Sequence, residues 1–286
     1  MRSLTIFLQL TKPRVMFLVM FSGLTALLLE GSLIGQPISA GLALLALYLT
    51  GGSANALNQY FERELDGKMS RTRNRRPLPL KRISPVSALI FSITIGVIGV
   101  AIFGLVFNFL TAILSLTTIV FYGFFYTLWL KPKTHLNIVI GGIAGAMAPV
   151  GIWAAATGTV ALAPVLLSLI IFLWTPPHFW ALALYCKDDY KAVRLPMLPV
   201  AKGDDSTYRQ ILIYSVFLFI TSLLLFAVPG IGWIYLVAAL ILGGILLSNS
   251  YRAYKLKSRI INIKLFRFSL MYLFILFSVV ILDGFL

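Results

Sequence analysis

Charged residues are scarce in this chain, and acidic residues are the scarcest of all. Only 12% of the 286 residues are charged, with nine acidic and 24 basic residues, whereas 59% are hydrophobic. A typical soluble protein has about 25% charged residues. This balance excludes an ordinary soluble domain and predicts a polytopic membrane protein that is all-α.

Cysteine and the common nucleotide-binding motifs are also nearly or wholly missing. The single cysteine, Cys186, excludes an internal disulfide and disfavours a thiolate metal cluster. There is no Walker-type loop, no Gly-x-Gly-x-x-Gly in a βαβ setting and no nucleophile elbow. We expect no cleavable signal, because residues 1–13 lead straight into a full-length apolar span. The net charge of +15 is explained by basic loops on one side of a membrane, so we expect no nucleic-acid partner.

Long apolar runs make up most of the chain. A helix needs about 20 apolar residues to cross the hydrocarbon of a bilayer, and nine segments meet this requirement. The predicted spans are Val15–Ile34, Ile38–Leu57, Val86–Val106, Leu110–Leu130, Ile138–Ala156, Leu162–Tyr185, Ile211–Val228, Ile231–Ser248 and Phe268–Phe285.

The basic residues predict how these nine spans are oriented. If the N-terminus is inside, the inner segments contain three basic residues before the first span and eight between the second and third. The remaining inner segments contain two, five and six, and the outer segments contain none. By the positive-inside rule, the N-terminus lies inside and the C-terminus outside.

Seven of the nine acidic residues lie in two inner loops, one after the second span and one after the sixth. They are Glu62, Glu64, Asp66, Asp188, Asp189, Asp204 and Asp205. Each loop follows the second span of a four-span set, which suggests two parallel repeats, 14–131 and 137–249, and a ninth helix at 268–285. We therefore expect one domain, 1–286, in which both loops meet at a single inner-face cavity.

Asn58, Glu62 and Asp66 follow one another at intervals of four residues. On a helix the three side chains fall within a stripe about 80° wide, and their oxygens are ligands that Mg²⁺ prefers. Asn58 and Asp66 would lie about 12 Å apart along the axis, so one ion cannot bind all three directly. Either two Mg²⁺ ions bridge a diphosphate or water completes the shell. The alternative is a solvated helix end whose charges mark the water interface.

Basic residues follow this stripe at once and could form a positive wall for a phosphate-bearing ligand. The candidate diphosphate-binding residues are Lys68, Arg71, Arg75, Arg76, Lys131 and Lys187. Pro77 and Pro79 end any helix there, so we expect the arginines on a loop that folds over a substrate. The alternative for some of them is contact with lipid headgroups. In the second acidic loop, adjacent Asp188 and Asp189 would diverge by about 100° on a helix, so only one is expected to face the cavity.

The sixth span contains Trp174-Thr-Pro-Pro-His178-Phe-Trp180. A Pro-Pro pair removes backbone hydrogen bonds, and membrane helices keep such breaks beside a cavity or buried protein. His178 could contact a flat aromatic substrate or its iron, with Trp174 and Trp180 beside it. The alternative is a structural kink with a hydrogen-bonded histidine.

Together these segments resemble the UbiA superfamily of intramembrane prenyltransferases. The first motif of that family is similar to Asn58-x-x-x-Glu62-x-x-x-Asp66 with Met69-x-Arg71-Thr72 and Arg76-Pro77. Further similar segments are Thr11-Lys12-Pro13, Tyr126-x-x-x-Leu130-Lys131, Asn137-Ile-Val-Ile-Gly-Gly142, Trp174-Thr-Pro-Pro-His178-Phe-Trp180, and Asp189-Tyr190 with Pro196-Met-Leu-Pro199. The glutamate in the first motif and the Thr11 segment resemble the branch of the family that farnesylates protohaem.

This resemblance implies nine helices around a central cavity that opens to the cytoplasmic side of the cell (inner) membrane. It implies Mg²⁺ as cofactor, and farnesyl diphosphate and haem B as substrates. The implied catalytic residues are Asn58, Glu62, Asp66 and Asp189, and the implied metal ligands are Asn58, Glu62, Asp66, Asp188 and Asp189. The implied acceptor pocket contains Tyr126, Trp174, His178 and Trp180. The family's second motif is usually Asp-x-x-x-Asp; Asp189 matches its first acid, but Val193 stands at the second, and Asp188 is a possible substitute.

The implied reaction gives haem O, for use by a downstream haem A synthase or terminal oxidase. One alternative is a related prenyltransferase acting on an aromatic quinone precursor, against which the His178 stretch argues. Another is a transporter of a phosphate compound or a cation. A transporter would be expected to have polar residues near the membrane midplane, and these spans are nearly free of charge there.

Overall fold

The computed structural model describes residues 2–285, and every regular element in that part of the chain is helical. The elements are α1 (Arg2–Leu10), α2 (Pro13–Glu30), α3 (Pro37–Phe61), α4 (Arg63–Lys68), α5 (Ser70–Arg73), α6 (Pro85–Ile102), η1 (Phe103–Phe107), α7 (Phe109–Val120), η2 (Phe121–Leu130), α8 (Asn137–Gly145), α9 (Ala148–Thr157), α10 (Leu162–Tyr185), α11 (Lys187–Ala192), α12 (Leu198–Ala201), α13 (Gly203–Leu224), η3 (Leu225–Ala227), α14 (Trp233–Leu256) and α15 (Arg259–Gly284).

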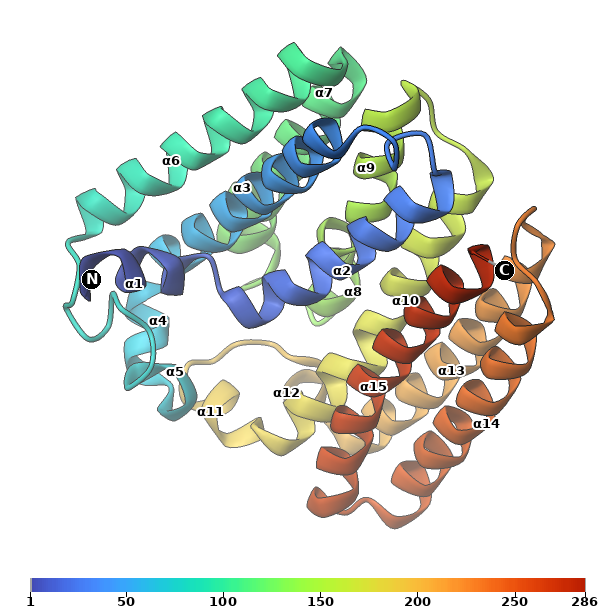
Figure 1. Ribbon diagram of the computed structural model, residues 1–286. Helices are drawn as coiled ribbons and strands as arrows, with labels where there is room; N and C mark the ends of the chain where they lie inside the picture. Colours follow the sequence, from blue (N-terminus) through green and yellow to red (C-terminus); the bar gives the residue numbers. More distant parts are fainter. Residues whose placement is uncertain (1, 286) are drawn as a thin grey trace.

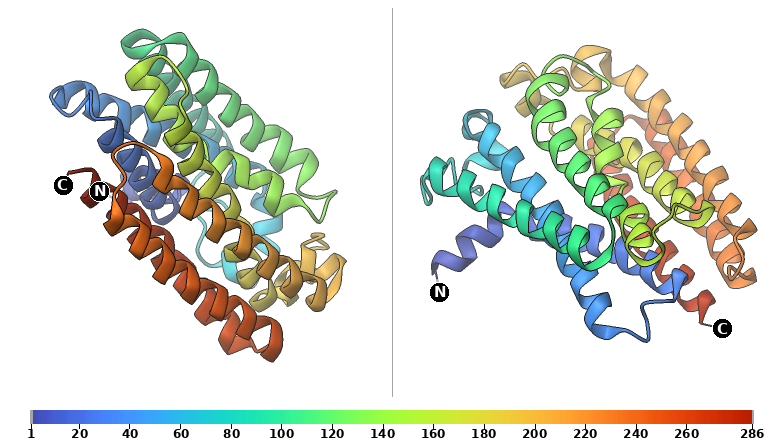
Figure 2. Two further views of the ribbon diagram at one scale, coloured as in Figure 1. Left: turned by 90° about the vertical axis from the view of Figure 1, so that its right-hand side faces the viewer. Right: turned by 90° about the horizontal axis from the view of Figure 1, so that it is seen from above.

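Nine helical segments of the described chain are long and apolar enough to cross a membrane, which confirms the predicted count. They are Pro13–Glu30, Pro37–Phe61, Pro85–Phe107, Phe109–Leu130, Asn137–Thr157, Leu162–Tyr185, Gly203–Ala227, Trp233–Leu256 and Arg259–Gly284. Figure 2 shows these long segments running side by side in one bundle. The ninth begins earlier than predicted, because its first turns carry basic residues that the apolar pattern leaves out.

Local sequence explains where several spans begin and end. Pro13, Pro37 and Pro85 each stand in the first turn of a helix, where a missing N–H costs nothing. Asn108 separates η1 from α7, and its side chain accepts from the Thr111 N–H at 3.0 Å to cap the new helix. Gly158 ends α9 with a φ of 71°, a conformation that suits glycine.

The outer surface of the bundle carries large apolar side chains, whereas small residues lie at the interfaces between helices. Large apolar side chains such as Leu105, Phe109 and Ile38 are exposed and would face lipid. Small residues lie where helices approach closely: a Cβ on Gly99 of α6 would come within 3.1 Å of the Ala46 carbonyl of α3. Such contacts bring α3 and α6 together at the centre of the N-terminal half.

Two features differ from simple helical spans. α10 runs without interruption through Pro176 and Pro177, so the proline pair removes hydrogen bonds without ending the helix. η2 is a π-helix, in which the Lys131 N–H bonds to the Tyr126 carbonyl five residues earlier. π-Helical turns occur frequently at functional sites.

The short helices lie in the two loops where the acidic residues cluster. α4 and α5 follow α3, and α11 and α12 follow α10. Figure 1 shows these four helices gathered at one end of the bundle, near α1. The two acidic loops therefore meet, as predicted, although their sequences are more than 100 residues apart.

Candidate active site

Asn58, Glu62 and Asp66 lie on one face across the junction between α3 and α4. The Glu62 N–H bonds to the Asn58 carbonyl at 3.0 Å, and the Asp66 N–H to the Glu62 carbonyl at 2.8 Å, so the helical register continues through the junction. The three residues are only 2%, 4% and 0% exposed. A solvated helix end would leave them in water, so the structure favours a built polar site.

Basic side chains from three separate segments converge on these oxygens. Arg76 pairs with Asp66 and lies 3.8 Å from Glu62. Lys131, at the end of η2, pairs with Glu62. Lys12 donates from Nζ to Asn58 Oδ1 at 2.6 Å. Three cations therefore face two carboxylates, and the site has an excess positive charge that suits an anionic ligand.

A residue of the π-helix η2 binds the amide nitrogen of Asn58. Asn58 Nδ2 donates to Thr127 Oγ1 at 3.2 Å, and that hydroxyl donates to the Tyr122 carbonyl at 2.6 Å. The amide is thereby oriented, with its oxygen toward Lys12 and its nitrogen toward η2. Sequence reasoning missed Lys12 and Thr127 as members of the site. The resemblance of the Thr11-Lys12-Pro13 segment to the family was the available signal for Lys12.

The two carboxyl groups respond differently to burial. Burial by itself would raise the pKa of Glu62, but attraction by Lys131, Lys12 and Arg76 holds that pKa below its ordinary value. Burial raises the pKa of Asp66, and the attraction of Arg76 offsets it only in part. Burial, followed by repulsion from Arg76, lowers the pKa of Lys12. The charges of the cluster are thus shielded from bulk solvent.

The donor set fits Mg²⁺. Asp66 Oδ1 is buried and has no hydrogen-bond partner among the described residues, so one carboxylate oxygen remains available. Within the part of the chain that the structure describes, no group of three or more His, Cys, Asp and Glu side chains could enclose a metal. Mg²⁺ usually keeps several waters and binds through one or two carboxylates plus substrate phosphates. Two carboxylates and an amide are therefore enough protein ligands for a magnesium ion that also binds substrate phosphates.

Asp189 connects the second acidic loop to the first. Its Oδ1 accepts from Ser70 Oγ at 2.7 Å and from the Ser70 N–H at 3.2 Å, and its Oδ2 accepts from the Arg71 N–H at 3.2 Å. Burial by itself would raise the pKa of Asp189, but the hydrogen bonds from Ser70 and Arg71 and the charge of Arg71 together hold that pKa below its ordinary value. Asp188 is exposed, as expected if only one of the pair faces inward.

The remaining predicted basic residues divide into two groups. Arg71 is half-buried, and its Nε is buried without a hydrogen-bond partner among the described residues. Lys68 and Arg75 are exposed. Lys187 donates to Asp204 at 2.5 Å. The structure thus brings Arg76, Lys131 and, nearby, Arg71 to the site, while Lys68, Arg75 and Lys187 lie outside these contacts.

The predicted acceptor-pocket residues do not all face the same way. Trp174 and His178 stack with ring centroids 4.3 Å apart, against α15. Trp180 turns to another side of α10, edge-on to Tyr214 of α13 at 5.3 Å. Tyr126 is buried on η2, and a Cβ on Gly141 would lie 2.6 Å from its ring.

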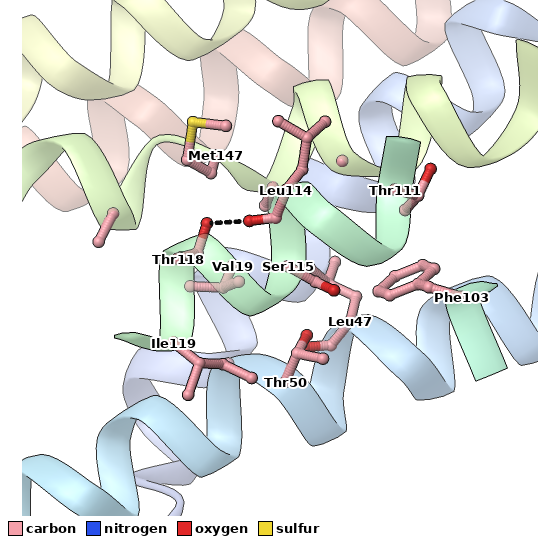
Figure 3. Close-up of a pocket in the computed structure, with 14 residues that line it drawn as sticks. Val19, Leu47, Thr50, Phe103, Thr111, Leu114, Ser115, Thr118, Ile119 and Met147 are labelled. Atoms are coloured by element: carbon pink, nitrogen blue, oxygen red, sulfur yellow. Dashed lines mark hydrogen bonds between the residues drawn. The ribbon is translucent and has the colours of Figure 1, made fainter. Parts of the chain in front are cut away.

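An apolar pocket lies further along α3 (Figure 3), among α2, α3, α7, α9 and neighbouring turns. Its lining includes Val19, Leu47, Phe103, Leu114 and Met147. Gly51, also in the lining, precedes Asn58 by seven residues, or about 10 Å along the helix.

Hydroxyl groups in the wall of this pocket are bonded internally. Thr50 donates to the Ala46 carbonyl at 2.8 Å, Thr118 to the Leu114 carbonyl at 2.7 Å, and Ser115 to the Ala112 carbonyl at 3.0 Å. Because their protons are used, the wall presents a largely apolar surface. A polar, cationic site and an apolar pocket therefore share one helix.

Comparison with known proteins decides the family. The sequence profile of the UbiA prenyltransferase family matches residues 19–276. The chain belongs to the UbiA prenyltransferase family. It is 46% identical over 285 residues to a protein named protoheme IX farnesyltransferase from Erythrobacter litoralis, covering 98% of this chain and 92% of that one. A protein of the same name from Rhodopseudomonas palustris is 44% identical over 281 residues, covering 97% and 89%.

Solved structures agree with the fold of this UbiA-family chain. A structure of a digeranylgeranylglyceryl phosphate synthase is similar at a TM-score of 0.82 and 18% identity, over 99% of each chain. A UbiA homolog from Archaeoglobus fulgidus bound to DMAPP and Mg²⁺ is similar at a TM-score of 0.65 and 16% identity, over 96% of this chain and 98% of that one. These similarities confirm the predicted resemblance and the all-helical membrane fold.

Proposed function

We propose that this prenyltransferase moves the farnesyl group of farnesyl diphosphate onto a vinyl group of protohaem IX (haem B), with addition of water, to give haem O and diphosphate. The observation that carries the proposal is the buried junction of α3 and α4, where carboxylates and three cations gather at one end of the helix that also lines an apolar pocket. The names of the full-length relatives support the choice of farnesyl and haem as substrates.

Asn58, Glu62 and Asp66 would hold Mg²⁺, with the free oxygen of Asp66 as a principal ligand. When bound, the metal would stabilise negative charge on the departing diphosphate. Lys12, Arg76 and Lys131 would share that charge from the opposite side. Because these cations are already directed at the site and little water reaches it, they stabilise the developing charge without first reorganising solvent.

We propose that the apolar pocket of Figure 3 receives the far end of the farnesyl chain. With its diphosphate between Asn58 and Asp66, the chain would run along α3 into the bundle, toward Gly51 at the near end of this pocket. Apolar walls exclude water, so the allylic cation formed on ionisation would meet the acceptor before it meets water.

The bond changes balance with no further reagent. The C–O bond of farnesyl diphosphate breaks, a C–C bond forms between the farnesyl carbon and the vinyl terminus, and water adds its oxygen to the adjacent carbon and releases a proton. Tyr126, and His178 with Trp174, would contact the acceptor. Trp180 faces α13 and would contribute only through packing.

We infer that the site faces the cytoplasm of a cell (inner) membrane, because both acidic loops lie on the side that carries the basic residues. The product would pass to a haem A synthase or a terminal oxidase. Two observations oppose a transporter: the site lies at the end of the bundle, and Glu62 and Asp66 lie outside the spans.

Mass spectrometry of haems extracted from cells, with and without this chain, tests the proposal. We expect haem O only when the chain is present, and we expect purified protein to consume farnesyl diphosphate when haem B is supplied. Failure with haem B but turnover of an aromatic quinone precursor would support the alternative acceptor. No prenyl transfer to either class would overturn the assignment.

A further inference from the structure

His178 is held in the middle of a stack of rings between α10 and α15. Its imidazole lies 4.3 Å from the Trp174 ring and 4.4 Å from the Phe266 ring, with interplanar angles of 18° and 23°. Phe179 meets it edge-on at 5.0 Å. Both faces of the imidazole are therefore covered, and only the ring edge is left for polar interactions.

Ser269 of α15 determines which nitrogen carries the proton. Its hydroxyl donates to the Phe266 carbonyl at 2.8 Å, and the same oxygen lies 2.7 Å from His178 Nδ1. A hydroxyl has one proton, so Ser269 Oγ accepts from Nδ1–H. In the neutral ring, Nε2 then carries the lone pair. Among the described residues, the side-chain hydrogen bond of this ring is made by Nδ1, and none is made by Nε2.

The same residue also anchors the neighbouring indole. Trp174 Nε1 donates to the Ser269 carbonyl at 2.7 Å. One residue of the ninth span thus fixes both rings of α10, one through its carbonyl and one through its hydroxyl. A histidine that serves only packing in a core would be expected to satisfy both nitrogens, and this one leaves a Lewis base at a defined edge.

We propose that His178 Nε2 is an axial ligand to the iron of the haem acceptor and that Ser269 is the positioning residue that fixes its tautomer and orientation. This inference rests on the proposed function, because it requires haem as a substrate. Metal-ligating histidines almost always donate their other N–H to a fixed acceptor, and loss of that partner costs about 10–100-fold in affinity. A tether at the iron would fix the position of the porphyrin centre relative to α10, and contacts at the porphyrin edge would then have to select the vinyl group.

Absorption spectroscopy and electron paramagnetic resonance of purified protein titrated with haem B test this assignment. We expect a histidine-ligated spectrum for the wild-type protein and for His135→Ala, the matched control at the other histidine. His178→Ala should lose that spectrum, and added imidazole should restore it. Ser269→Ala should raise the Kd for haem about 10-fold or more, and Ser269→Thr, which keeps the hydroxyl, should restore binding.

The outcomes separate the ligand assignment from the proposed function. If His178→Ala keeps the wild-type spectrum while the wild-type protein makes haem O, the ligand assignment is overturned and the function stands. If Ser269→Ala binds haem as tightly as wild type, the positioning role is overturned. If the wild-type protein neither binds haem nor makes haem O, the proposed function fails and this inference fails with it.

Discussion

Lys12 has a backbone conformation that lysine rarely adopts. Its φ is 54°, in the left-handed region, which costs a residue with a side chain about 1–2 kcal/mol. The conformation lets the chain turn from α1 into α2 at Pro13 while Lys12 Nζ reaches Asn58. Strained residues of this kind cluster at functional sites. At the residue scale, the contact between Lys12 and Asn58 joins two residues that lie 46 positions apart in the sequence.

Replacing Lys12 with Met should weaken substrate binding while preserving the length of the side chain. A hydrogen bond to a charged group contributes about 1.5–3 kcal/mol, so we expect the KM for farnesyl diphosphate to rise about 10-fold or more. Steady-state kinetics of purified protein measure this. Arg14→Met, at an exposed position two residues later, is the control. Equal KM values for both variants would remove Lys12 from the site.

Replacing Asp66 or Glu62 with Ala should abolish turnover without preventing membrane insertion. Each change removes a proposed metal ligand and takes the closest carboxylate away from a partly buried cation, Arg76 or Lys131. We expect activity to fall by about 100-fold or more, as when a preorganised charge partner is lost. Product assays on membranes containing equal amounts of protein measure this, with Glu64→Ala, an exposed acid in the same loop, as control. Normal activity in either variant would contradict the metal assignment.

At the scale of elements, α5 depends on a residue from another loop. The N-cap residue of α5 is Met69, whose side chain accepts no hydrogen bond from the first N–H groups of the helix. The carboxylate of Asp189, in α11, accepts from the N–H groups of Ser70 and Arg71 instead. The carboxylate thereby ties the two loops together and orients Arg71. The contacts support a bridging role for Asp189 and give no direct support to a second metal there.

Asp189→Asn should loosen this connection, because an amide supplies one acceptor where the carboxylate uses two. We expect trypsin to cleave the 71–76 loop several times faster in the variant, as followed by gel electrophoresis of purified protein. Asp188→Asn, one residue earlier and exposed, should leave the rate unchanged. Identical cleavage of both variants would mean that the bridge does not hold the loop.

Gly141 of α8 allows η2 to approach closely enough for Tyr126 to pack against it. A Cβ at this position would lie 2.6 Å from the Tyr126 ring. We expect Gly141→Ala to lower the unfolding free energy by about 1–3 kcal/mol through overpacking. Gly145→Ala, on the same helix with no atom within 4 Å of its Cβ, is the control. Thermal unfolding in detergent would show a lower Tm for the first variant only; unchanged Tm values would contradict the packing argument.

At the scale of the whole molecule, the two acidic loops meet at one end of a nine-span bundle. Each loop follows the second span of its half and contains two short helices, α4 with α5 and α11 with α12. We propose that residues 14–131 and 137–249 are two copies of one four-helix unit, with the ninth span added. The direction of the bundle in the membrane rests on the distribution of basic residues.

Labelling of single cysteines tests this orientation. In a Cys186→Ser background, the chain has no other thiol. We expect a membrane-impermeant maleimide to label Thr159→Cys, in the loop between α9 and α10, in intact cells. Asn74→Cys, in the first acidic loop, should be labelled only after the cells are permeabilised. Both positions are exposed. The reverse pattern would invert the predicted topology.

The sequence by itself was sufficient for features that depend on residues within a few helical turns. These include the nine spans, whose apolar length is local, and the shared stripe of Asn58, Glu62 and Asp66, which follows from the helical repeat. Packing alone decided which partners these residues have. Lys12 lies 46 residues from Asn58, Lys131 lies 69 from Glu62, and Asp189 lies 119 from Ser70. Contacts over such separations depend on how helices are arranged in space, and no periodic pattern along the chain records them.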